Sequence, residues 1–494
     1  MRFIAAVLIT AVFAGGPAPA QTTQSAKPKP MNVLFIAVDD LRPQLGCYGQ
    51  AQMKTPNLDA LAASGLLFNR AYCQQAVCSP SRTSLLTGRR PDTTRVYDLE
   101  THFRTTIPDV ITLPQHFKNG GYHTQGFGKI YHGSLDDERS WSVPHTPVPG
   151  PAYADPKTLA EIKAKREALR DQDLKPRRQN RLIKGPPWES AEVSDDDKLP
   201  DGKTASSAIK ALREVKDKPF FLAVGFVKPH LPFVAPKKYF DLYPPAEQIA
   251  LPKDDARPQG APDIAFTDFG ELRGYVGVPK DGPVPEQQAR ELIRAYYAAT
   301  SYMDAQVGRL LAELDALGLR DNTIIILWGD HGWHLGEQGQ WCKHTNFENA
   351  TRAAMMIAVP GKVSGVKRGA KTDALVEFVD IYPTLCELAG LSLPAGLEGT
   401  SFVSLLADPS RAWKPAAFSQ YPRRGNVMGY SMRTDRYRYT EWQGEGGKPV
   451  ATELYDHQTD PAETTNIAAQ ADQAEVVKKL AEQLSAGWKS AAPR

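Results

Sequence analysis

Three continuous apolar runs of strand length constrain the fold more than any other feature of the sequence. They are residues 32–38 (NVLFIAV), 220–227 (FFLAVGFV) and 323–328 (TIIILW). A strand that is solvated on one face alternates apolar and polar residues, whereas a strand covered on both faces is apolar throughout. These runs therefore predict parallel strands that lie inside a sheet with helices on both sides. Residues 122–127 and 354–359 are expected to add two further strands.

Segments with helical spacing of apolar residues separate these runs. The expected helices span residues 55–64, 113–118, 205–215, 287–317 and 378–389. Gly318 and Gly390 follow the last two, and glycine is common where a helix ends. Alternating strands and helices predict an α/β fold with a large, mostly parallel sheet flanked by helices.

The first thirty residues are not expected to belong to this fold. Residues 1–20 combine a positive start, an apolar run and a closing Ala-Pro-Ala, which is typical of a signal peptide cleaved near Ala20. Residues 21–30 are polar and predict a tether. We therefore expect an exported protein, secreted or, in a Gram-negative host, periplasmic. No later apolar run reaches the roughly 20 residues of a membrane helix, so no transmembrane segment is expected.

The remaining chain divides into two expected parts. Residues 31–390 are expected to form the large α/β domain, interrupted by a charged, solvated insertion at about residues 155–203 that carries a surface helix. Residues 391–494 form a smaller C-terminal subdomain. Its short aromatic runs with alternating polarity predict an antiparallel sheet, and a final amphipathic helix is expected near residues 473–488.

Charge and cysteine content exclude some functions. The 59 Lys and Arg residues and 56 Asp and Glu residues leave a net charge of +3. This balance argues against a nucleic-acid partner, because proteins that coat nucleic acid bind through many phosphate contacts. The five cysteines are an odd number, so at least one is unpaired in an exported protein that would usually pair them.

Polar residues follow four of the expected strands, and the carboxyl ends of parallel strands meet at one edge of a sheet. These residues are Asp39 and Asp40, Lys129 and His132, His230, and Asp330 and His331. Three clustered carboxylates would repel one another without a cation, and oxygen donors suit Ca²⁺ or Mg²⁺. His331 is either a fourth ligand or a hydrogen-bond donor beside the ion. The basic groups, with Lys343 further along, suit an anionic substrate; the alternative is a structural metal with unrelated surface lysines.

Cys78 opens the stretch CSPSRTSLLTGR, in which Pro80 suits the first turn of a helix and Gly88 its end. The N-terminus of a helix favours anions and activates a nucleophile. Cys78 is therefore a candidate thiolate, and the alternative is a buried or disulfide-bonded structural cysteine.

This stretch resembles the signature of type I sulfatases, C-x-P-S-R followed by T-G. In that family a maturation enzyme oxidises the cysteine to Cα-formylglycine (3-oxoalanine). The stretches IAVDDLRPQLGCYG, FFLAVGFVKPHLPF and DHGWHLGEQGQWCKHTNFE are similar to the iduronate-2-sulfatase branch, and the resemblance extends along nearly all of the mature chain. It implies an alkaline-phosphatase-like fold.

The resemblance also implies a role for each site residue. The metal ligands would be Asp39, Asp40, Asp330, His331 and the modified Cys78, with Ca²⁺ the usual ion and Mg²⁺ in some relatives. Arg82 would hold the modified side chain, and Trp333 could form a pocket wall or belong to the core. The groups expected to grip the sulfate and assist proton transfer are Lys129, His132, His230 and Lys343.

By the same resemblance, the aldehyde hydrates to a gem-diol, one hydroxyl attacks sulfur, and His230 protonates the leaving sugar oxygen. The second hydroxyl then expels sulfate. The expected substrate is a 2-O-sulfated uronic acid in a glycosaminoglycan fragment. The alternatives are a promiscuous aryl sulfatase or phosphomonoesterase, and a catalytically dead glycan-binding protein. His334 and the short segment 361–373 depart from the family pattern where the sugar could bind.

Overall fold

The computed structural model describes residues 29–493 except 171, 173–181, 362 and 364, together with residues 6, 8 and 10. Apart from those three positions, the predicted signal peptide lies outside the described residues, as does the tether up to residue 28. Within the part of the chain that is described, no helix has the length and apolar character to cross a membrane.

A seven-stranded sheet forms the centre of the molecule, in the order β13-β2-β12-β8-β1-β6-β4. Its strands are β1 (Asn32–Val38), β2 (Leu66–Phe68), β4 (His123–Gly128), β6 (Phe220–Phe226), β8 (Thr323–Gly329), β12 (Met355–Ala358) and β13 (Ala370–Thr372). The neighbours β8, β1, β6 and β4 are parallel, and β12 runs antiparallel to both of its neighbours. The expected large, mostly parallel sheet is confirmed.

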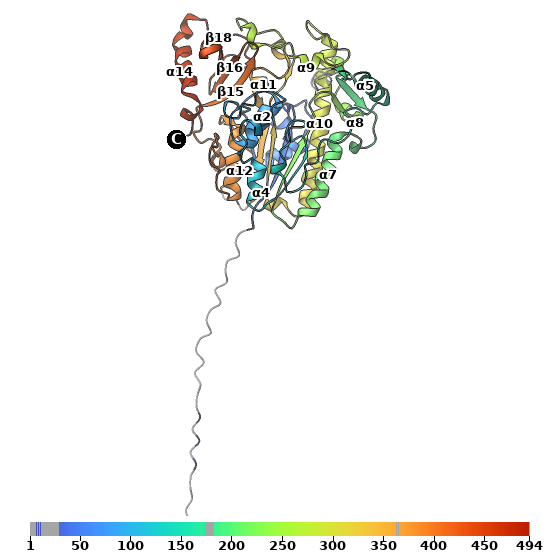
Figure 1. Cartoon of the computed structure of the whole chain (residues 1–494), viewed down its shortest axis with the longest axis vertical. Coiled ribbons are helices and arrows are strands. Elements are labelled where there is room, and N and C mark those ends of the chain that lie inside the picture. Colours follow the sequence, from blue (N-terminus) through green and yellow to red (C-terminus); the bar gives the residue numbers. More distant parts are fainter. Residues whose placement is uncertain are drawn as a thin grey trace, which may run out of the picture.

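Helices cover both faces of this sheet (Figure 1). On one face lie α2 (Cys78–Thr87), α4 (Leu113–Asn119), α12 (Ile381–Ala389) and α13 (Val403–Ala407). On the other face lie α1 (Pro56–Ser64), α7 (Pro200–Val215) and α10 (Glu286–Ala316). Successive strand side chains point to opposite faces, so Phe35 of β1 joins the first core and Ile36 the second. This is why the central strands are apolar at every position.

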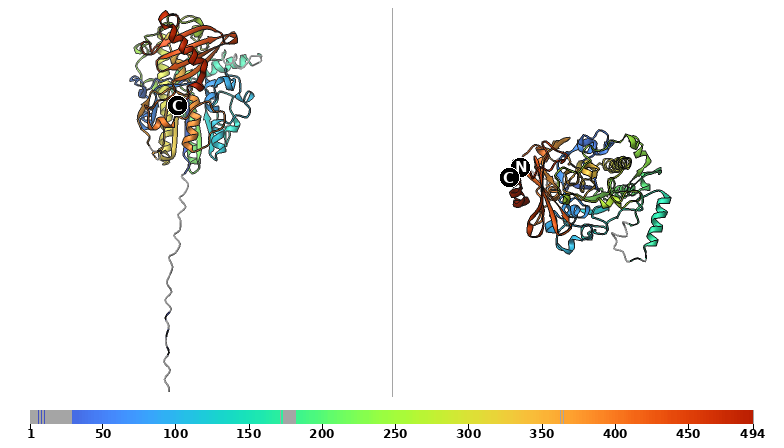
Figure 2. Two further views of the ribbon diagram at one scale, coloured as in Figure 1. Left: turned by 90° about the vertical axis from the view of Figure 1, so that its left-hand side faces the viewer. Right: turned by 90° about the horizontal axis from the view of Figure 1, so that it is seen from above.

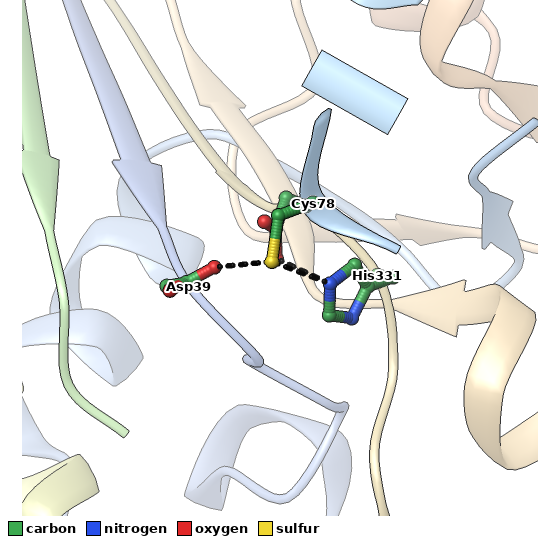
Figure 3. Close-up of side chains that lie close together, drawn as sticks. Asp39, Cys78 and His331 are labelled. Carbon is green, nitrogen blue, oxygen red and sulfur yellow. Dashed lines mark hydrogen bonds and ion pairs between the residues drawn. The ribbon is translucent and has the colours of Figure 1, made fainter. Parts of the chain in front are cut away.

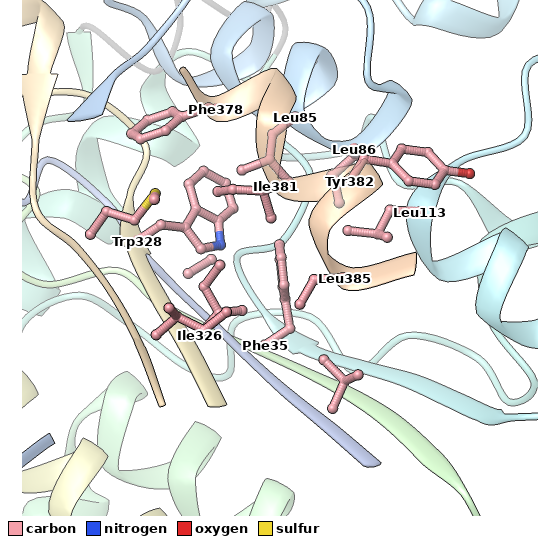
Figure 4. Close-up of a cluster of buried hydrophobic side chains, with 14 of the residues drawn as sticks. Phe35, Leu85, Leu86, Leu113, Ile326, Trp328, Phe378, Ile381, Tyr382 and Leu385 are labelled. Carbon is pink, nitrogen blue, oxygen red and sulfur yellow. The ribbon is translucent and has the colours of Figure 1, made fainter. Parts of the chain in front are cut away.

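The core around α2 fixes the helix that carries Cys78. Leu85 of α2 packs with Phe35 and Trp328 of the sheet and with Ile381 and Leu385 of α12 (Figure 4). The rings of Phe35 and Trp328 lie 5.5 Å apart between centroids. Burial of each such side chain contributes roughly 1.5–3 kcal/mol, so α2 is held firmly against the sheet.

A four-stranded antiparallel sheet forms the C-terminal part, as expected. Its strands are β15 (Ala416–Arg423), β16 (Val427–Thr434), β17 (Tyr437–Gln443) and β18 (Pro449–Asp456). Helix α14 (Ala474–Ser490) lies across it (Figure 2). Leu480 and Leu484 of this helix pack against the strands. The last strand expected from the sequence, residues 453–455, is extended by four residues at its start.

The expected solvated insertion at residues 155–203 is too long. Its surface helix is present as α5 (Pro156–Ala168). However, β5 (Trp188–Ala191) pairs with β7 (Phe233–Pro236), and α7 begins at Pro200. The sequence pattern did not reveal these elements, because buried residues such as Ala191 and Leu199 are isolated among charged residues and show no period. The insertion therefore ends before Trp188.

The sequence analysis missed the short strands β2 and β13, because three residues are too few to show a period. The remaining short elements are β3 (Ala71–Tyr72), α3 (Pro91–Thr94), α8 (Lys237–Phe240), α9 (Gly270–Arg273), β9 (His334–Leu335), β10 (Trp341–Cys342), α11 (Glu348–Thr351), β11 (Arg352–Ala353) and β14 (Val376–Glu377).

Candidate active site

The carboxyl ends of β1 and β8 bring three acids, Asp39, Asp40 and Asp330, onto one edge of the sheet, beside the end of β6. The amide of Asp39 donates to the carbonyl of Phe226 at 3.1 Å, and the amide of Asp330 donates to that of Val38 at 3.1 Å. Asp40 turns out of the strand with a φ of 60°, and its amide donates to the Oδ1 atom of Asp330 at 3.0 Å. Acids 290 residues apart in the chain thus share a hydrogen bond at the edge of the sheet.

The N-terminus of α2 points at these acids. The Sγ atom of Cys78 lies 3.3 Å from Oδ1 of Asp39 and 3.4 Å from Nε2 of His331 (Figure 3). The Oγ atom of Ser81, one turn further along, donates to the carbonyl of Asp330. The helix ends at Gly88, whose φ of 65° favours glycine.

The cluster has the donor set of a divalent-cation site. Ligand atoms of Asp39, Cys78, Asp330 and His331 all lie within 4.8 Å of one another. Oδ2 of the neighbouring Asp40 is buried and has no hydrogen-bond partner. The Nδ1 atom of His331 bonds to the carbonyl of Gly332 at 2.9 Å, which leaves Nε2 facing the cluster. These residues fit a calcium or magnesium ion, which would neutralise the acids and occupy the free oxygen.

The pKa values of the adjacent acids Asp39 and Asp40 shift in opposite directions. Burial alone would raise the pKa of Asp39, but Lys129, His230 and Arg82 hold it well below its usual value. Burial raises the pKa of Asp40, even though Lys343 opposes the rise. A divalent cation between such neighbouring buried carboxylates would let both of them ionise.

Arg82 connects the residues of the site through its hydrogen bonds. Its guanidinium donates to Oδ2 of Asp330 at 2.8 Å, to Oδ1 of Asp39 at 3.3 Å and to the carbonyl of Ile130 at 3.1 Å. Burial would lower the pKa of Arg82, but Asp330 and Asp39 raise it, so the group stays charged. A buried, forked donor of this kind fixes the loops after three strands in one geometry.

Three of the expected sulfate-binding groups converge on the same place. The ammonium of Lys129 contacts Asp39 and lies 3.7 Å from Sγ of Cys78. The Nζ atom of Lys343 donates to Oδ1 of Asp40 at 2.9 Å, and Nε2 of His230 lies 3.9 Å from both acids. The two lysines come from different loops, so two positive charges lie against Asp39 and Asp40.

His132 lies beside this group but, among the described residues, makes no hydrogen bond or ion pair with it. Its Nδ1 atom is buried without a hydrogen-bond partner. Burial, followed by the nearby Lys129, lowers the pKa of His132 to about 3. The ring is therefore neutral at ordinary pH.

The expectation that Cys78 is a thiolate is wrong for the unmodified side chain. Burial, followed by the charge of Asp39, raises the pKa of the Cys78 thiol well above its usual value. The helix N-terminus favours the thiolate, but burial beside acids outweighs it. None of the five cysteines, all of which lie in the described ranges, forms a disulfide bond.

The structure also places Trp333 and His334 in the core rather than in a pocket wall. Trp333 is 1% exposed, and Nζ of Lys343 lies 4.8 Å from its ring centroid. Trp333 thus supports Lys343 from behind. His334 is fully buried and bonds to Oγ1 of Thr345 at 2.9 Å, so its departure from the family pattern does not alter the pocket surface.

Sequence reasoning missed Glu271, which lies on the four-residue helix α9. Its Oε1 atom is 3.0 Å from Nε2 of His230, and its Oε2 atom is 3.2 Å from Nζ of Lys343. Burial would raise the pKa of Glu271, but Lys343 and His230 hold it well below its usual value. No strand end, motif or helical period marks this position in the sequence.

Comparison with known proteins agrees with this geometry. A family model described as sulfatase matches residues 31–391, and one described as N-sulphoglucosamine sulphohydrolase, C-terminal, matches residues 336–489. The chain is 37% identical to an iduronate 2-sulfatase of Mus musculus over 88% of this chain and 90% of that protein. It is 36% identical to an iduronate 2-sulfatase of Homo sapiens over 90% of this chain and 92% of that protein.

A solved phosphonate monoester hydrolase of Agrobacterium radiobacter has a similar structure. The TM-score is 0.74 with 26% identity, over 93% of this chain and 95% of that chain. The sulfatase match spans well over half of the sequence, and both iduronate 2-sulfatases exceed 30% identity. The chain therefore belongs to the sulfatase family, as a type I sulfatase similar to iduronate 2-sulfatases, and its reaction is the hydrolysis of sulfuric esters.

Proposed function

We propose that this sulfatase removes the sulfate from a 2-O-sulfated uronic acid in a glycosaminoglycan fragment, using Cys78 as formylglycine. The observation that carries the proposal is the position of Cys78, with Asp39, His331 and Lys129 all within 3.7 Å of its sulfur. The similarity to iduronate 2-sulfatases over about nine-tenths of the chain supports the choice of sugar.

A divalent cation, Ca²⁺ or Mg²⁺, and the modified Cys78 supply the chemistry that ordinary side chains lack, namely an activated hydroxyl nucleophile beside a fixed positive charge. The side chains proposed to hold the ion are Asp39, Asp40, Asp330 and His331, together with the modified residue 78. Arg82 keeps two of these carboxylates in place through its hydrogen bonds.

Lys129 and Lys343 approach from different loops and are proposed to neutralise the charge on the sulfate oxygens as it develops. His230 is proposed to protonate the leaving sugar oxygen. Its two ring nitrogens each face an oxygen acceptor, the carbonyl of Leu231 and the carboxylate of Glu271, which suits a doubly protonated ring. Burial and Lys343 lower the pKa of His230, whereas Asp39 and the hydrogen bond with Glu271 raise it, so these two acids favour the protonated ring that a general acid needs.

The test is to incubate the purified, modified protein with defined disaccharides that carry a single sulfate at the 2-O, 6-O or N position. We expect sulfate release from the 2-O-sulfated uronic acid to have the highest kcat/KM. Preferred cleavage of a 6-O- or N-sulfated sugar would contradict the assigned position, and binding without sulfate release would indicate a catalytically dead glycan-binding protein.

The similarity to a phosphonate monoester hydrolase favours a second candidate function. The same lysines and acids could serve aryl sulfates and phosphate monoesters. Values of kcat/KM for nitrophenyl sulfate and nitrophenyl phosphate, measured beside the sugar sulfate, separate the two. An aryl ester cleaved better than every sugar sulfate would establish a promiscuous hydrolase.

We also propose that the protein is exported after cleavage near Ala20 and is modified by a formylglycine-generating enzyme of its host. The composition of residues 1–20 supports export. N-terminal sequencing of protein recovered from the periplasm or medium should begin at Gln21. Recovery only inside the cell, with Met1 retained, would contradict the proposal.

A further inference from the structure

The site has a buried floor and a partly exposed rim. The side chains of Asp39, Asp40, Asp330 and His331 are 0% exposed. The rim residues Lys129, Glu271, His230 and His344 are 12%, 16%, 21% and 22% exposed. A sulfate ester that meets Cys78 must enter with its sulfate first, so its sugar lies against the rim. The rim therefore selects the sugar.

Glu271 is the one acid among these four rim residues, and it stands beside the proposed proton donor. Its carboxylate lies 3.0 Å from His230, 3.2 Å from Lys343 and 3.9 Å from Nε2 of His344. When His230 protonates the ester oxygen of the substrate, the sulfated ring carbon bonded to that oxygen therefore lies close to the carboxylate of Glu271. The group on the neighbouring ring carbon must fit against Glu271.

The segment that carries Glu271 is braced on both sides. The ammonium of Lys184 donates to the carbonyl of Glu271 at 2.9 Å. The guanidinium of Arg273 donates to the carbonyls of Asp268, Pro279 and Gly282 at 2.9, 2.8 and 2.6 Å. These bonds hold α9 in place beside the upper part of α10 (Figure 1). A carboxylate on a braced segment is suited to discriminate between substrates.

We infer that Glu271 is a specificity-determining residue that accepts a hydrogen bond from a hydroxyl next to the sulfated carbon and rejects a second anion there. This inference rests on the proposed function. A carboxylate only accepts hydrogen bonds, so a neighbouring hydroxyl is a matched partner. A sulfate in the same place would meet a like charge, which is strongly unfavourable in a partly desolvated site. In a 2-sulfated uronic acid that neighbour is the hydroxyl on carbon 3.

The test uses three substrates: methyl iduronoside 2-sulfate, its 3-deoxy analogue and its 2,3-disulfate. The wild type should prefer the 2-sulfate to both others in kcat/KM. Glu271→Gln removes the charge but keeps an acceptor oxygen, so the preference over the disulfate should fall by about tenfold or more, whereas the preference over the 3-deoxy sugar should largely persist. Glu271→Ala should weaken both preferences.

The matched control is Asp281→Asn, which removes an acid from an exposed position of the same segment and should leave all three kcat/KM values unchanged. Both substrates of each ratio are assayed on one preparation, so the fraction of unfolded enzyme affects both kcat/KM values equally and does not change their ratio. If Glu271→Gln leaves the kcat/KM ratios between substrates unchanged, this inference is wrong and the proposed function stands. An equal loss of kcat/KM on all three sugars would show that Glu271 has a purely structural role, and it would also overturn this inference alone. Wild-type enzyme that cleaves none of the sugars would overturn the proposed function and this inference with it.

Discussion

Cys78 occupies surroundings that suit a modified side chain better than a thiol. It is 2% exposed, Asp39 and His331 lie within contact distance of its sulfur, and burial raises the pKa of the thiol. A neutral thiol at this position is a poor nucleophile. We therefore predict that mass spectrometry of the active protein shows loss of sulfur and gain of oxygen at residue 78. Full activity of a preparation that retains the thiol would contradict this prediction.

A second prediction at the residue scale concerns the metal ion. Asp39→Ala and Asp330→Ala should each lower kcat by roughly 10³-fold or more, because they remove ligands of the group that stabilises charge in the transition state. Chelation should inactivate the wild type, and Ca²⁺ or Mg²⁺ should restore it. Asp263→Asn, at a fully exposed side chain, is the control and should retain activity. Unchanged rates after exhaustive metal removal would speak against a metal enzyme.

The third prediction separates two roles of His230. A sugar alkoxide needs a proton to leave, whereas a nitrophenolate hardly needs one. His230→Ala should therefore lower sugar-sulfate hydrolysis by about 10²–10⁴-fold and affect nitrophenyl sulfate much less. Steady-state kinetics on the two esters provide the measurement. Equal losses would show that His230 only binds sulfate, and the proton donor would then be Lys343, because the His132 ring is neutral at ordinary pH.

At the scale of elements, α2 must hold its place for Cys78 and Arg82 to meet the strand ends. Leu85 is fully buried between α2, the sheet and α12. Leu85→Ala should lower the free energy of unfolding by about 2–5 kcal/mol, because it removes buried surface and leaves a cavity. Chemical denaturation measures this. Leu393→Ala, at a 56% exposed side chain, should change it by no more than about 0.5 kcal/mol. Similar effects of the two substitutions would show that this core does not anchor α2.

At the scale of the whole molecule, the C-terminal sheet is bound to the catalytic part through buried contacts. Arg438 of β17 donates to Oε1 of Glu463 at 2.6 Å and also to Glu348 of α11. Phe347, beside α11, packs against Tyr455 of β18 and against His334. The boundary expected near residue 391 therefore divides the sequence into two parts, but side chains of both parts pack in the same core.

The buried His334 at this junction predicts a pH dependence of stability. Burial lowers the pKa of His334 to about 4, against 6.5 in the unfolded chain. Between these values the unfolded chain binds a proton that the folded protein does not, so stability falls as the pH falls. At pH 5 this costs about 2 kcal/mol relative to pH 7.5. His334→Gln should remove that part of the acid sensitivity in denaturation measured at both pH values, and parallel profiles would contradict the assignment.

Much of the fold and of the site follows from local sequence. The run NVLFIAV followed by two acids, and TIIILWG followed by Asp330 and His331, identify covered strands and the edge where they end. The parallel register of β1 with β6 and β8 then places those ends together. The apolar pattern of a strand and the residues that follow it are local properties, so both can be predicted from the sequence without a structure.

Other features depend on which distant segments meet. Glu271 reaches His230 from a short helix with no pattern of its own, and Trp333 and His334 are core residues although they follow the metal-site motif directly. Burial, followed by the charge of Asp39, raises the pKa of the Cys78 thiol, and both depend on segments far away in the chain. Burial and electrostatic surroundings are sums over tertiary neighbours, so only the folded structure decides them, whereas the period of a strand and the residues at its end are written in the sequence itself.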